Sequence, residues 1–566
     1  MATSRIARAT ESPAGIDPAP PAPLDVDVLV VGSGIAGTVA AITAASEGAR
    51  VALACIGRFL GGSSFFPGTW GLGLIGPRDT SDAEDLIDSI LDVGQGVAEP
   101  GLVRTLVEGI LPAVDWLERE LDVALKRPES DASAEEAAFI PCFDHNRRLW
   151  RGLTRTELER AFACAVRQRG VRILEHTELV DMIKDDGGGG VSCAWLYDRR
   201  RDELRACRVG AAVLACGGTS GLFARRLTAG DVIGSGHGIA LQQGCTLANI
   251  EFMQMMPGYV APVPGLVFNE KTFRYIEGTD SSPRLRGISP TRQAALLEMR
   301  SGHGPFSARR DDRLIDLAID EAGEAGLAVH YDLPPYEAQP EFVRVFNAWL
   351  EDEHGIRPTD ELRVALYAHA SNGGIAIGSD AQTEVPGLFA CGEATGGMHG
   401  ADRIGGLSSA NGLVFGRIAG ASAARWARRR EGDGMRTRIE AKCPSARGIP
   451  VEKGRSGLKC IREIMGARAM VARDEAGLGQ AAIALHRVDE ERRAAERDTD
   501  AAAERAADLR LRAQILLAQS MICAMRARTE SRGAHMRTDR PGPDARFAHP
   551  SRTRLGADAS PRTVIG

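Results

Sequence analysis

The stretch from Asp27 to Cys55 reads DVLVVGSGIAGTVAAITAASEGARVALAC, and it decides the fold. An apolar run at Val28–Val31 leads into the turn GSGIAG at Gly32–Gly37, and a helix of small residues follows. A second apolar run at Val51–Ala54 closes the unit. Strand, glycine turn, helix and strand within about thirty residues predict a dinucleotide site in an α/β domain.

The three glycines of the turn have separate roles. Gly32 allows the tight turn, Gly34 lets the backbone approach a pyrophosphate, and Gly37 lets the helix pack closely on the strand. The helix N-terminus offers free N–H groups and a positive dipole end to phosphates. The second strand ends at Cys55, not at the Asp or Glu that would bind a ribose hydroxyl, which argues against ordinary NAD binding and leaves FAD open.

The overall composition excludes several classes of function. The 566 residues include 44% hydrophobic and 25% charged ones, as in ordinary globular proteins. A net charge of −6 provides no electrostatic basis for binding nucleic acid. Eleven cysteines without a CxxC pair or a close quartet argue against a zinc or iron–sulfur site, so no metal site is predicted. Their odd number, without a signal peptide, indicates a reducing compartment and predicts a cytoplasmic location.

The order of patterns along the chain predicts a nucleotide-binding domain that is interrupted by a second domain. The most apolar segment, Val28–Ala45, belongs to the βα unit and is not expected to cross a membrane. The predicted segments are a disordered leader at 1–24, the nucleotide domain at 25–257 and 366–430, an insertion at 258–365, a helical domain at 431–540 and a disordered tail at 541–566.

Apolar periodicity predicts the main elements. Helices are expected at Ala83–Val93, Leu102–Leu121, Thr154–Arg169, Asp311–Gly326, Pro340–His354, Cys460–Arg468, Leu478–Ala494 and Ala502–Arg528. Strands are expected at Val171–Leu174, Thr177–Ile183, Val191–Tyr197 and Arg205–Leu214, as a β meander. The glycine-containing segment Gly448–Leu458 predicts a linker.

Five landmarks in a fixed order resemble one flavoprotein family. They are VVGSGIAG, VLACGG, GHGIALQQGCTLANIEFMQ, GLFACGEATGGMHGADRIGGLSSANGLVFGRIAG and ARTESRGAHMRTDRP, and they extend from Asp27 to Pro541. The chain is similar to the flavoproteins of succinate dehydrogenase and fumarate reductase and to L-aspartate oxidase. The resemblance implies a Rossmann-like FAD-binding α/β domain, an inserted α+β capping domain and a C-terminal helical bundle.

In this family the flavin N5 exchanges a hydride with a Cα–Cβ or Cα–N bond of a small carboxylate. By resemblance, Arg403 and His369 are expected to bind carboxylates, since an Arg recognises a planar anion through two hydrogen bonds. A surface salt bridge for Arg403 and a structural role for His369 are the alternatives.

The resemblance also implies a proton relay. The family's relay arginine precedes a helix of the capping domain, and Arg310 matches that place, with Arg309 or Arg313 as alternatives. Glu270 is expected to be the relay glutamate. The plain alternative for this arginine cluster is a solvated helix start.

The positions expected to contact FAD share their place in the landmarks. They are Gly32, Gly34, Gly37, Ser63, Gly218, Asp231, Glu393 and Ser408. A helix N-terminus near Ser408 would direct its dipole at the pyrimidine end of the flavin.

Three departures from the family pattern bear on the substrate and on FAD attachment. The loop GGSSFFPG at 61–68 has no histidine where respiratory dehydrogenases attach FAD, so non-covalent FAD is expected. Met256 stands where the family has a carboxylate-binding histidine. Pro141 or Cys142 stands where L-aspartate oxidases carry a glutamate for the substrate amine, before the segment His145–Arg148.

The sequence therefore predicts an FAD oxidoreductase of the fumarate reductase type that acts at a CH–CH bond of a small mono- or dicarboxylate. Oxidation of an amino acid at CH–NH, as in L-aspartate oxidase, is the second reading. A third reading is the flavoprotein subunit of an electron-transfer complex, with a separate iron–sulfur partner protein because this chain lacks cysteine clusters.

Overall fold

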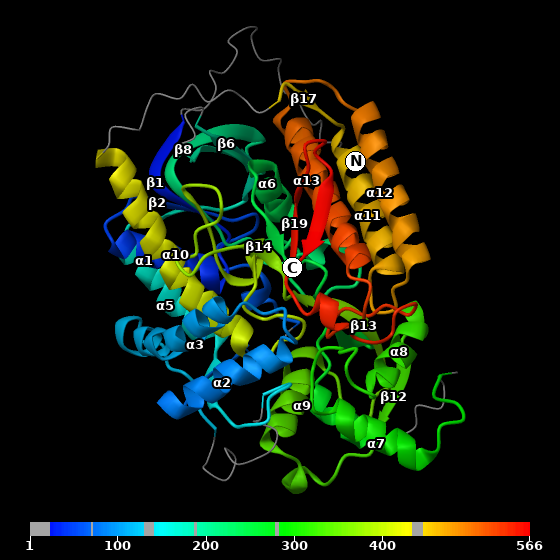
Figure 1. The fold of residues 1–566 in the computed structure, drawn as a ribbon. Helices are drawn as coiled ribbons and strands as arrows, with labels where there is room; N and C mark the ends of the chain where they lie inside the picture. The colour runs from blue at the N-terminus through cyan, green and yellow to red at the C-terminus, as the bar shows by residue number, and fades with distance from the viewer. Residues whose placement is uncertain are drawn as a thin grey trace, which may run out of the picture.

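The computed structural model describes residues 23–68, 72–128, 141–185, 190–277, 282, 284–432 and 445–566. The predicted leader at 1–24 lies almost wholly outside these residues. Figure 1 shows the blue N-terminal α/β part beside the yellow helix α10, with the green inserted part below and the yellow-to-orange C-terminal helices at the side. The structure therefore has the predicted α/β fold with an insertion and a helical C-terminal part.

The largest sheet contains the predicted βαβ unit. Its strands run in the order β5-β2-β1-β8-β7-β6, with β15 also paired to β8. The strands β5, β2, β1, β8 and β15 are parallel, whereas β6 and β7 form the expected antiparallel meander with β8. The strands are β1 (Leu24–Val31), β2 (Val51–Ala54), β5 (Arg172–Leu174), β6 (Thr177–Lys184), β7 (Val191–Asp198), β8 (Glu203–Leu214) and β15 (Leu388–Ala390).

Small residues explain how the helices pack on this sheet. The helix α1 (Ile35–Ser46) is buried along most of its length and packs against α10 (Leu407–Gly432). A Cβ atom at Gly420 would collide with the backbone of Ala40. The glycine therefore lets the two helix backbones touch. Through this contact α1, which precedes the insertion in the chain, packs closely on α10, which follows it.

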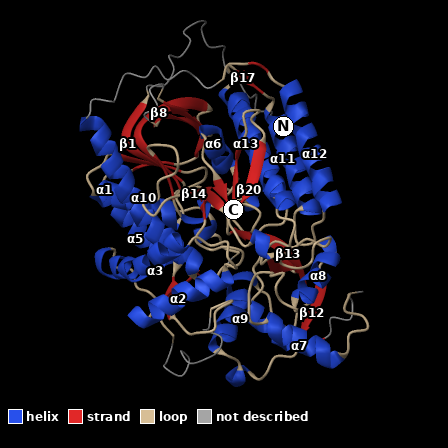
Figure 2. Ribbon diagram, viewed as in Figure 1, coloured by secondary structure: helices blue, strands red, loops and turns tan. Residues whose placement is uncertain are grey.

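Three amphipathic helices lie below α1 and α10 in the view of Figures 1 and 2, where α3 contacts α10, α2 contacts α3, and α5 contacts α1. They are α2 (Thr80–Val93), α3 (Pro100–Asp115) and α5 (Arg155–Gln168). The helix predicted to reach Leu121 changes at Trp116–Glu120 into a π-helical turn. The strands β3 (Leu72–Gly76) and β4 (Leu149–Leu153) form a short antiparallel pair. In the chain β3 precedes α2 and β4 precedes α5, and residues of both strands line a cavity shared with the inserted part.

The inserted part is a small α+β unit built on a four-stranded sheet of order β10-β13-β12-β11. The chain enters it on β10 and leaves it on the antiparallel strand β13. The expected boundaries of the insertion, at residues 258 and 365, therefore fall inside these two strands. The elements are β10 (Met253–Ala261), β11 (Ile276–Glu277), α7 (Pro290–Arg300), α8 (Arg313–Glu321), β12 (Leu327–Tyr331), α9 (Glu341–His354) and β13 (Leu362–Ser371).

Three helices form the predicted C-terminal bundle: α11 (Val451–Arg468), α12 (Glu475–Ala494) and α13 (Ala502–Ala527). The linker expected at Gly448–Leu458 is wrong, because α11 already begins at Val451. A Cβ at Gly457 would come within 2.6 Å of Leu511 on α13. This glycine permits close helix packing within the segment that the sequence predicted to be a linker.

The tail expected to be disordered at 541–566 is instead a β-hairpin. The strands β19 (Ser551–Leu555) and β20 (Pro561–Ile565) pair with each other, and β19 also pairs with β9 (Leu247–Ala248). They complete a sheet of order β16-β14-β9-β19-β20, with β14 at Gly374–Ala376 and β16 at Thr395–Gly396. Local composition cannot reveal a pairing between strands about 300 residues apart. Pro550 directly precedes β19 and Pro561 begins β20, positions at which proline is tolerated in a sheet.

Within the part of the chain that the structure describes, no helix is both long and apolar enough to cross a membrane.

Candidate active site

The first cavity opens at the carboxyl ends of β1, β2 and β8, where an open parallel sheet binds its ligand. Four of the five sequence landmarks contribute residues to its lining. The lining includes Gly32, Ser33, Gly34, Ser63, Ser64, Gly217, Asp231, Gly392, Glu393 and Ser408. The predicted cofactor positions are thus largely brought together at one edge of the sheet.

The glycine turn has the geometry that the sequence requires. Gly32 has φ +109°, and a Cβ there would collide with the carbonyl of Ala215 on the neighbouring strand. Gly37 does not line the cavity, because it faces the backbone of Gly32 and lets α1 pack on β1. At Gly34 the space is open, since the nearest atom to an added Cβ is the Ser64 hydroxyl at 3.4 Å. The turn therefore leaves room for a ligand at the helix N-terminus.

Two polar side chains of this cavity are incompletely hydrogen-bonded. Asp231 Oδ2 accepts the Gly62 N–H at 2.9 Å, and burial raises the pKa of this carboxyl. Its Oδ1 and the Ser63 hydroxyl are buried and have no hydrogen-bond partner among the described residues. Buried polar atoms are normally paired, so these two are available to a polar ligand.

The remaining cofactor positions divide into two groups. Ser408 lies in the first turn of α10 and lines the cavity. Glu393 also lines the cavity, from the short turn at Gly392–Ala394. Glu393 Oε1 accepts the backbone N–H of Ser371 at 2.9 Å. Gly218 does not line the cavity, because it lies against the Glu393 carboxylate, whereas the preceding Gly217 does.

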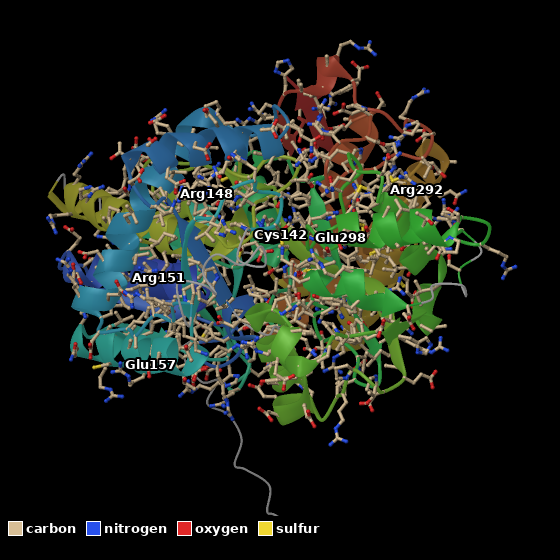
Figure 3. All side chains as sticks on the ribbon, turned by 90° about the horizontal axis from the view of Figure 1, so that it is seen from below. Cys142, Arg148, Arg151, Glu157, Arg292 and Glu298 are labelled. Atoms are coloured by element: carbon tan, nitrogen blue, oxygen red, sulfur yellow. The ribbon has the colours of Figure 1, made fainter. Side chains whose placement is uncertain are left out.

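A second cavity lies between the FAD-binding part and the inserted part. It shares His369, Arg403 and Gly406 with the first cavity. Figure 3 shows one of its lining residues, Cys142, between the blue-to-cyan N-terminal elements and the green inserted part. The two cavities therefore meet at the predicted carboxylate-binding pair.

Arg403 is buried at this junction. Its Nε and Nη2 both donate to Gln254 Oε1, at 3.1 and 3.0 Å. Burial lowers the pKa of the guanidinium, and no carboxylate of the described residues forms an ion pair with it. A buried cation without an ionic partner is costly unless a ligand supplies the anion. The geometry therefore supports anion binding and excludes the surface salt bridge.

His369 is a neutral imidazole at neutral pH, because burial and the charge of Arg403 lower its pKa to about 4. Its Nδ1 is buried without a hydrogen-bond partner in the described part of the chain. An incoming anion would offset the Arg403 charge and would accept a hydrogen bond from this ring.

Glu270 lines the second cavity beside two neutral side chains. The Cys142 thiol donates to Glu270 Oε1 at 3.0 Å, and burial raises the pKa of this thiol to about 12. Met256 also lines the cavity, so the place where the family has a histidine is occupied by a thioether. A carboxylate surrounded by such groups retains capacity for a proton or a polar ligand.

The structure does not bring Arg310 to either cavity. Its side chain is about one third exposed, and its Nε contacts Asp312 Oδ2 at 3.3 Å. Of the two alternatives, Arg309 approaches Asp402 at 3.7 Å, and Arg313 bonds the carbonyl of Arg310 at 2.9 Å. The geometry therefore favours the plain reading of this cluster as a helix start.

Sequence reasoning missed two polar residues of the second cavity, Asn269 and Lys271. Both adjoin Glu270, so their place in the sequence was the available signal. Gln254, which orients Arg403, lies within a quoted landmark but had no assigned role. The arginine Arg148 in the His145–Arg148 segment is structural, since it is buried on Asp82 and Asp144 at 2.6 and 2.8 Å.

The first cavity fits FAD. The open space at Gly34 suits a pyrophosphate at the N-terminus of α1, and the unpaired Asp231 and Ser63 atoms suit hydroxyl groups. The N-terminus of α10 with Ser408, at the side of Arg403, suits the flavin end.

Two family models match the chain. The model described as "FAD binding domain" matches residues 27–268 and 312–409, and "Fumarate reductase flavoprotein C-term" matches residues 459–559. Fold and cofactor cavity thus define an FAD-dependent oxidoreductase.

The chain belongs to the flavoprotein family of succinate dehydrogenase, fumarate reductase and L-aspartate oxidase. It is 28% identical over 552 residues to an L-aspartate oxidase of Streptomyces coelicolor, covering 92% of this chain and 90% of the relative. It is 26% identical over 559 residues to a fumarate reductase flavoprotein subunit of Escherichia coli, covering 91% and 88%. The structure of the Mycobacterium smegmatis Sdh1 complex in the apo form has the same fold, with a TM-score of 0.73 at 23% identity and a coverage of 96% and 94%.

Proposed function

We propose that this protein exchanges a hydride with a CH–CH bond of a small carboxylate that Arg403 anchors. The observation that carries the proposal is the buried Arg403 guanidinium, which has no ionic partner in the described chain and lies where the two cavities meet. A carboxylate bound there would receive two parallel hydrogen bonds and would neutralise a charge that is otherwise uncompensated.

Binding and orientation follow from the groups around Arg403. Gln254 occupies Nε and Nη2, which fixes the plane of the guanidinium and therefore the plane of a bound carboxylate. The ring of His369 provides a second contact on the same anion. FAD in the first cavity would supply the hydride acceptor or donor at its N5 atom. The inserted part excludes water from one side of the substrate.

The reaction also requires a proton at the carbon that does not exchange hydride. Glu270 is a carboxyl group in the wall of the second cavity and is our candidate for this proton donor. Its Oε1 already accepts a hydrogen bond from the Cys142 thiol. We infer that Glu270 holds the proton at Oε2 and transfers it toward the substrate. Arg310 has no part in this path, because its side chain lies outside the cavity.

Oxidation of an amino acid at CH–NH is the second candidate. The relative from Streptomyces coelicolor is named L-aspartate oxidase, and Glu270 offers an anion that an ammonium group would need. The neutral Cys142 in the place of the amine-binding glutamate of such oxidases disfavours it.

Further assignments extend the proposal. FAD is held without a covalent bond, because the loop at 61–68 contains no histidine. The ten described cysteines are free thiols, which agrees with a reducing, cytoplasmic environment. Electrons reach or leave the flavin through a separate donor or acceptor, and an iron–sulfur partner protein is one candidate for it.

The test is an anaerobic half-reaction. The FAD-loaded protein is reduced and mixed with fumarate, and the visible absorbance of the oxidised flavin is followed. Rapid return of the absorbance is expected for CH–CH chemistry. In the converse experiment the oxidised protein is mixed with L-aspartate, and bleaching by the amino acid without reoxidation by fumarate would replace the first candidate by the second.

Arg403→Met provides the matched test of the anchor. The flavin should stay bound, and the rate of reoxidation should fall roughly 30- to 5,000-fold, as for truncation of one partner of a buried charge pair. Arg292→Met is the control, because Arg292 lies on the exposed helix α7 and pairs with Asp311 at 3.3 Å (Figure 3). An unchanged rate in Arg403→Met would contradict the assignment.

A further inference from the structure

We propose that Asp402 is a positioning residue that couples the placement of the inserted part to the orientation of Arg403. It does so at a joint that consists of Asp402, Ser307 and the C-terminal loop 532–534. The inference rests on the proposed function, because Arg403 is taken to be the substrate anchor. It assigns a role in substrate binding to groups that line neither cavity.

Asp402 connects the FAD-binding part with the inserted part. Its carboxylate is fully buried, and Oδ2 accepts the hydroxyl of Ser307, in the inserted part, at 2.7 Å. The same oxygen accepts Gln95 Nε2, from the loop after α2, at 3.3 Å, and Arg309 Nε lies at 3.7 Å. Because Oδ1 has no hydrogen-bond partner among the described residues, Oδ2 makes all of these contacts. The short bond to Ser307 therefore fixes the distance between the two parts.

The C-terminal loop 532–534 holds both sides of this contact. The carbonyl of Gly533 accepts the backbone N–H of Ala308, the residue after Ser307, at 2.7 Å. The next residue of the loop, Ala534, donates its N–H to the carbonyl of Ala401, the residue before Asp402, at 3.0 Å. Figure 1 shows the red end of the chain reaching the green inserted part. The loop therefore bonds the chain on either side of the Asp402–Ser307 contact.

The geometry of this loop leaves it little freedom to move. Gly533 has φ +50°, and a Cβ there would lie 2.5 Å from the carbonyl oxygen of Ala401. Arg532 is held by two hydrogen bonds to the buried Glu530, at 2.7 and 2.9 Å, and its Nη1 donates to the carbonyl of Gln95 at 2.7 Å. A buried bidentate pair of this kind is rigid, so the loop is a fixed support for the joint.

Arg403 is affected through the backbone. It follows Asp402 directly, but the two side chains share no hydrogen-bond partner, because Arg403 Nε and Nη2 donate to Gln254 on β10. The strand β10 leads into the inserted part, so this part is attached to the anchor through Gln254 and again through Ser307. A guanidinium that binds a carboxylate through two hydrogen bonds is sensitive to small displacements, and both attachments are needed to align it.

The test is a double-mutant cycle between Ser307→Ala and Arg403→Met. Reoxidation of the reduced, FAD-loaded protein is followed over a range of fumarate concentrations, and bleaching of the oxidised protein by L-aspartate replaces it if fumarate is inert. Ser307→Ala should lower the second-order rate constant about 5- to 150-fold, because it leaves a buried acceptor unpaired. In the Arg403→Met background the same change should alter that constant by less than about twofold, since the group on which it acts is gone.

Two sets of variants exclude a general defect. Ser301→Ala is the matched control, because its hydroxyl is also fully buried in the inserted part but donates to the carbonyl of Glu298 at 2.7 Å. It should lower the thermal midpoint as Ser307→Ala does and leave the rate constant unchanged. Asp402→Asn keeps an acceptor for the Ser307 hydroxyl and should stay within about threefold of the wild type, whereas Asp402→Ala should lose at least as much as Ser307→Ala.

The contribution of the C-terminal loop is tested by Gly533→Ala. The added methyl group should displace the backbone at Ala401 and lower the rate constant, again without further effect in the Arg403→Met background. Gly542→Ala is the control in the same part of the chain, because no atom lies within 4 Å of an added Cβ there. If Gly533→Ala matches Gly542→Ala, the loop is not part of the joint.

The outcomes separate this inference from the proposed function. Equal losses for Ser307→Ala with and without Arg403, or a loss no larger than that of Ser301→Ala, would overturn the positioning role while Arg403 remains the anchor. If neither acid reacts with the wild type, or if Arg403→Met leaves the rate constant unchanged, the proposed function fails and this inference fails with it.

Discussion

The two cavities of this protein differ in the parts of the chain that build them. The first is lined largely by Gly, Ala and Ser, in the glycine turns after β1 and β8 and at the N-termini of α1 and α10, where the backbone lies close to the ligand space. The second is bounded by side chains that come from the FAD-binding part and from the inserted part. Backbone shape is shared by a whole family, whereas a single side chain can change the ligand. The cofactor cavity therefore identifies the class, and the substrate cavity distinguishes this member.

The largest expected effect tests the first cavity, which is expected to bind the cofactor. Gly32→Ala should abolish FAD binding, because φ +109° disfavours any side chain and the added Cβ would collide with Ala215. The flavin content of the purified protein measures this. Gly48→Ala is the matched control, since φ is +86° there but no atom lies within 4 Å of an added Cβ. It should cost only about 1–2 kcal/mol of stability and keep the flavin. Equal flavin loss in both variants would show that the strain of the positive φ, and not the collision with Ala215, causes the loss.

An intermediate effect is expected where the two parts of the molecule meet. Asp402 Oδ2 accepts the hydroxyl of Ser307, in the inserted part, at 2.7 Å. Burial raises the pKa of this carboxyl from 3.8 to about 7, although Ser307 and the charges of Arg309 and Arg310 act in the opposite direction. Between these pH values the folded protein holds a proton that the unfolded chain has released. The free energy of unfolding should therefore fall as the pH rises through this window.

Asp402→Asn removes that proton linkage. The unfolding free energy of the variant relative to the wild type should rise with pH from about 4 to about 7 and then level off. The buried His237 and His369, each with a pKa lowered to about 4, act in the opposite direction but are present in both proteins. Urea unfolding over a pH series measures the difference, and a pH-independent difference would exclude a neutral Asp402.

The smallest effect is expected at Arg310, where the sequence and the structure disagree. Its guanidinium is partly exposed on Asp312, so Arg310→Met should change the rate of flavin reoxidation by less than about threefold. Stopped-flow reoxidation beside Arg403→Met measures both assignments in one experiment. A loss in Arg310→Met as large as in Arg403→Met would restore the relay expected from sequence.

Much of the molecule could be predicted from the sequence because the relevant signals are local. The glycine turn at Gly32, the meander of β6, β7 and β8, and the helices of the C-terminal bundle follow from motif and periodicity over short windows. Where local signals misled, the cause was packing between distant segments. The strand β19 is formed by pairing with β9, and Gly457 lies inside α11 because it contacts Leu511.

The same division holds at the candidate site. Arg403, His369 and Glu270 were expected from the family resemblance, and the structure places all three at the second cavity. The exclusion of Arg310 could not be foreseen, because it depends on how the loop before α8 turns toward Asp312. Asn269 and Lys271 flank Glu270 in the sequence, but only the structure shows that both line the second cavity.

The sequence by itself determined the class of fold and the cofactor and pointed to Arg403 as the proposed carboxylate anchor, since each depends on residues close together in a motif. Only the tertiary structure decided which charged groups share the substrate cavity and which face water. The physical reason is that burial and the balance of charges are properties of the assembled surroundings, to which β10, the turn after it and the segment near Cys142 each contribute.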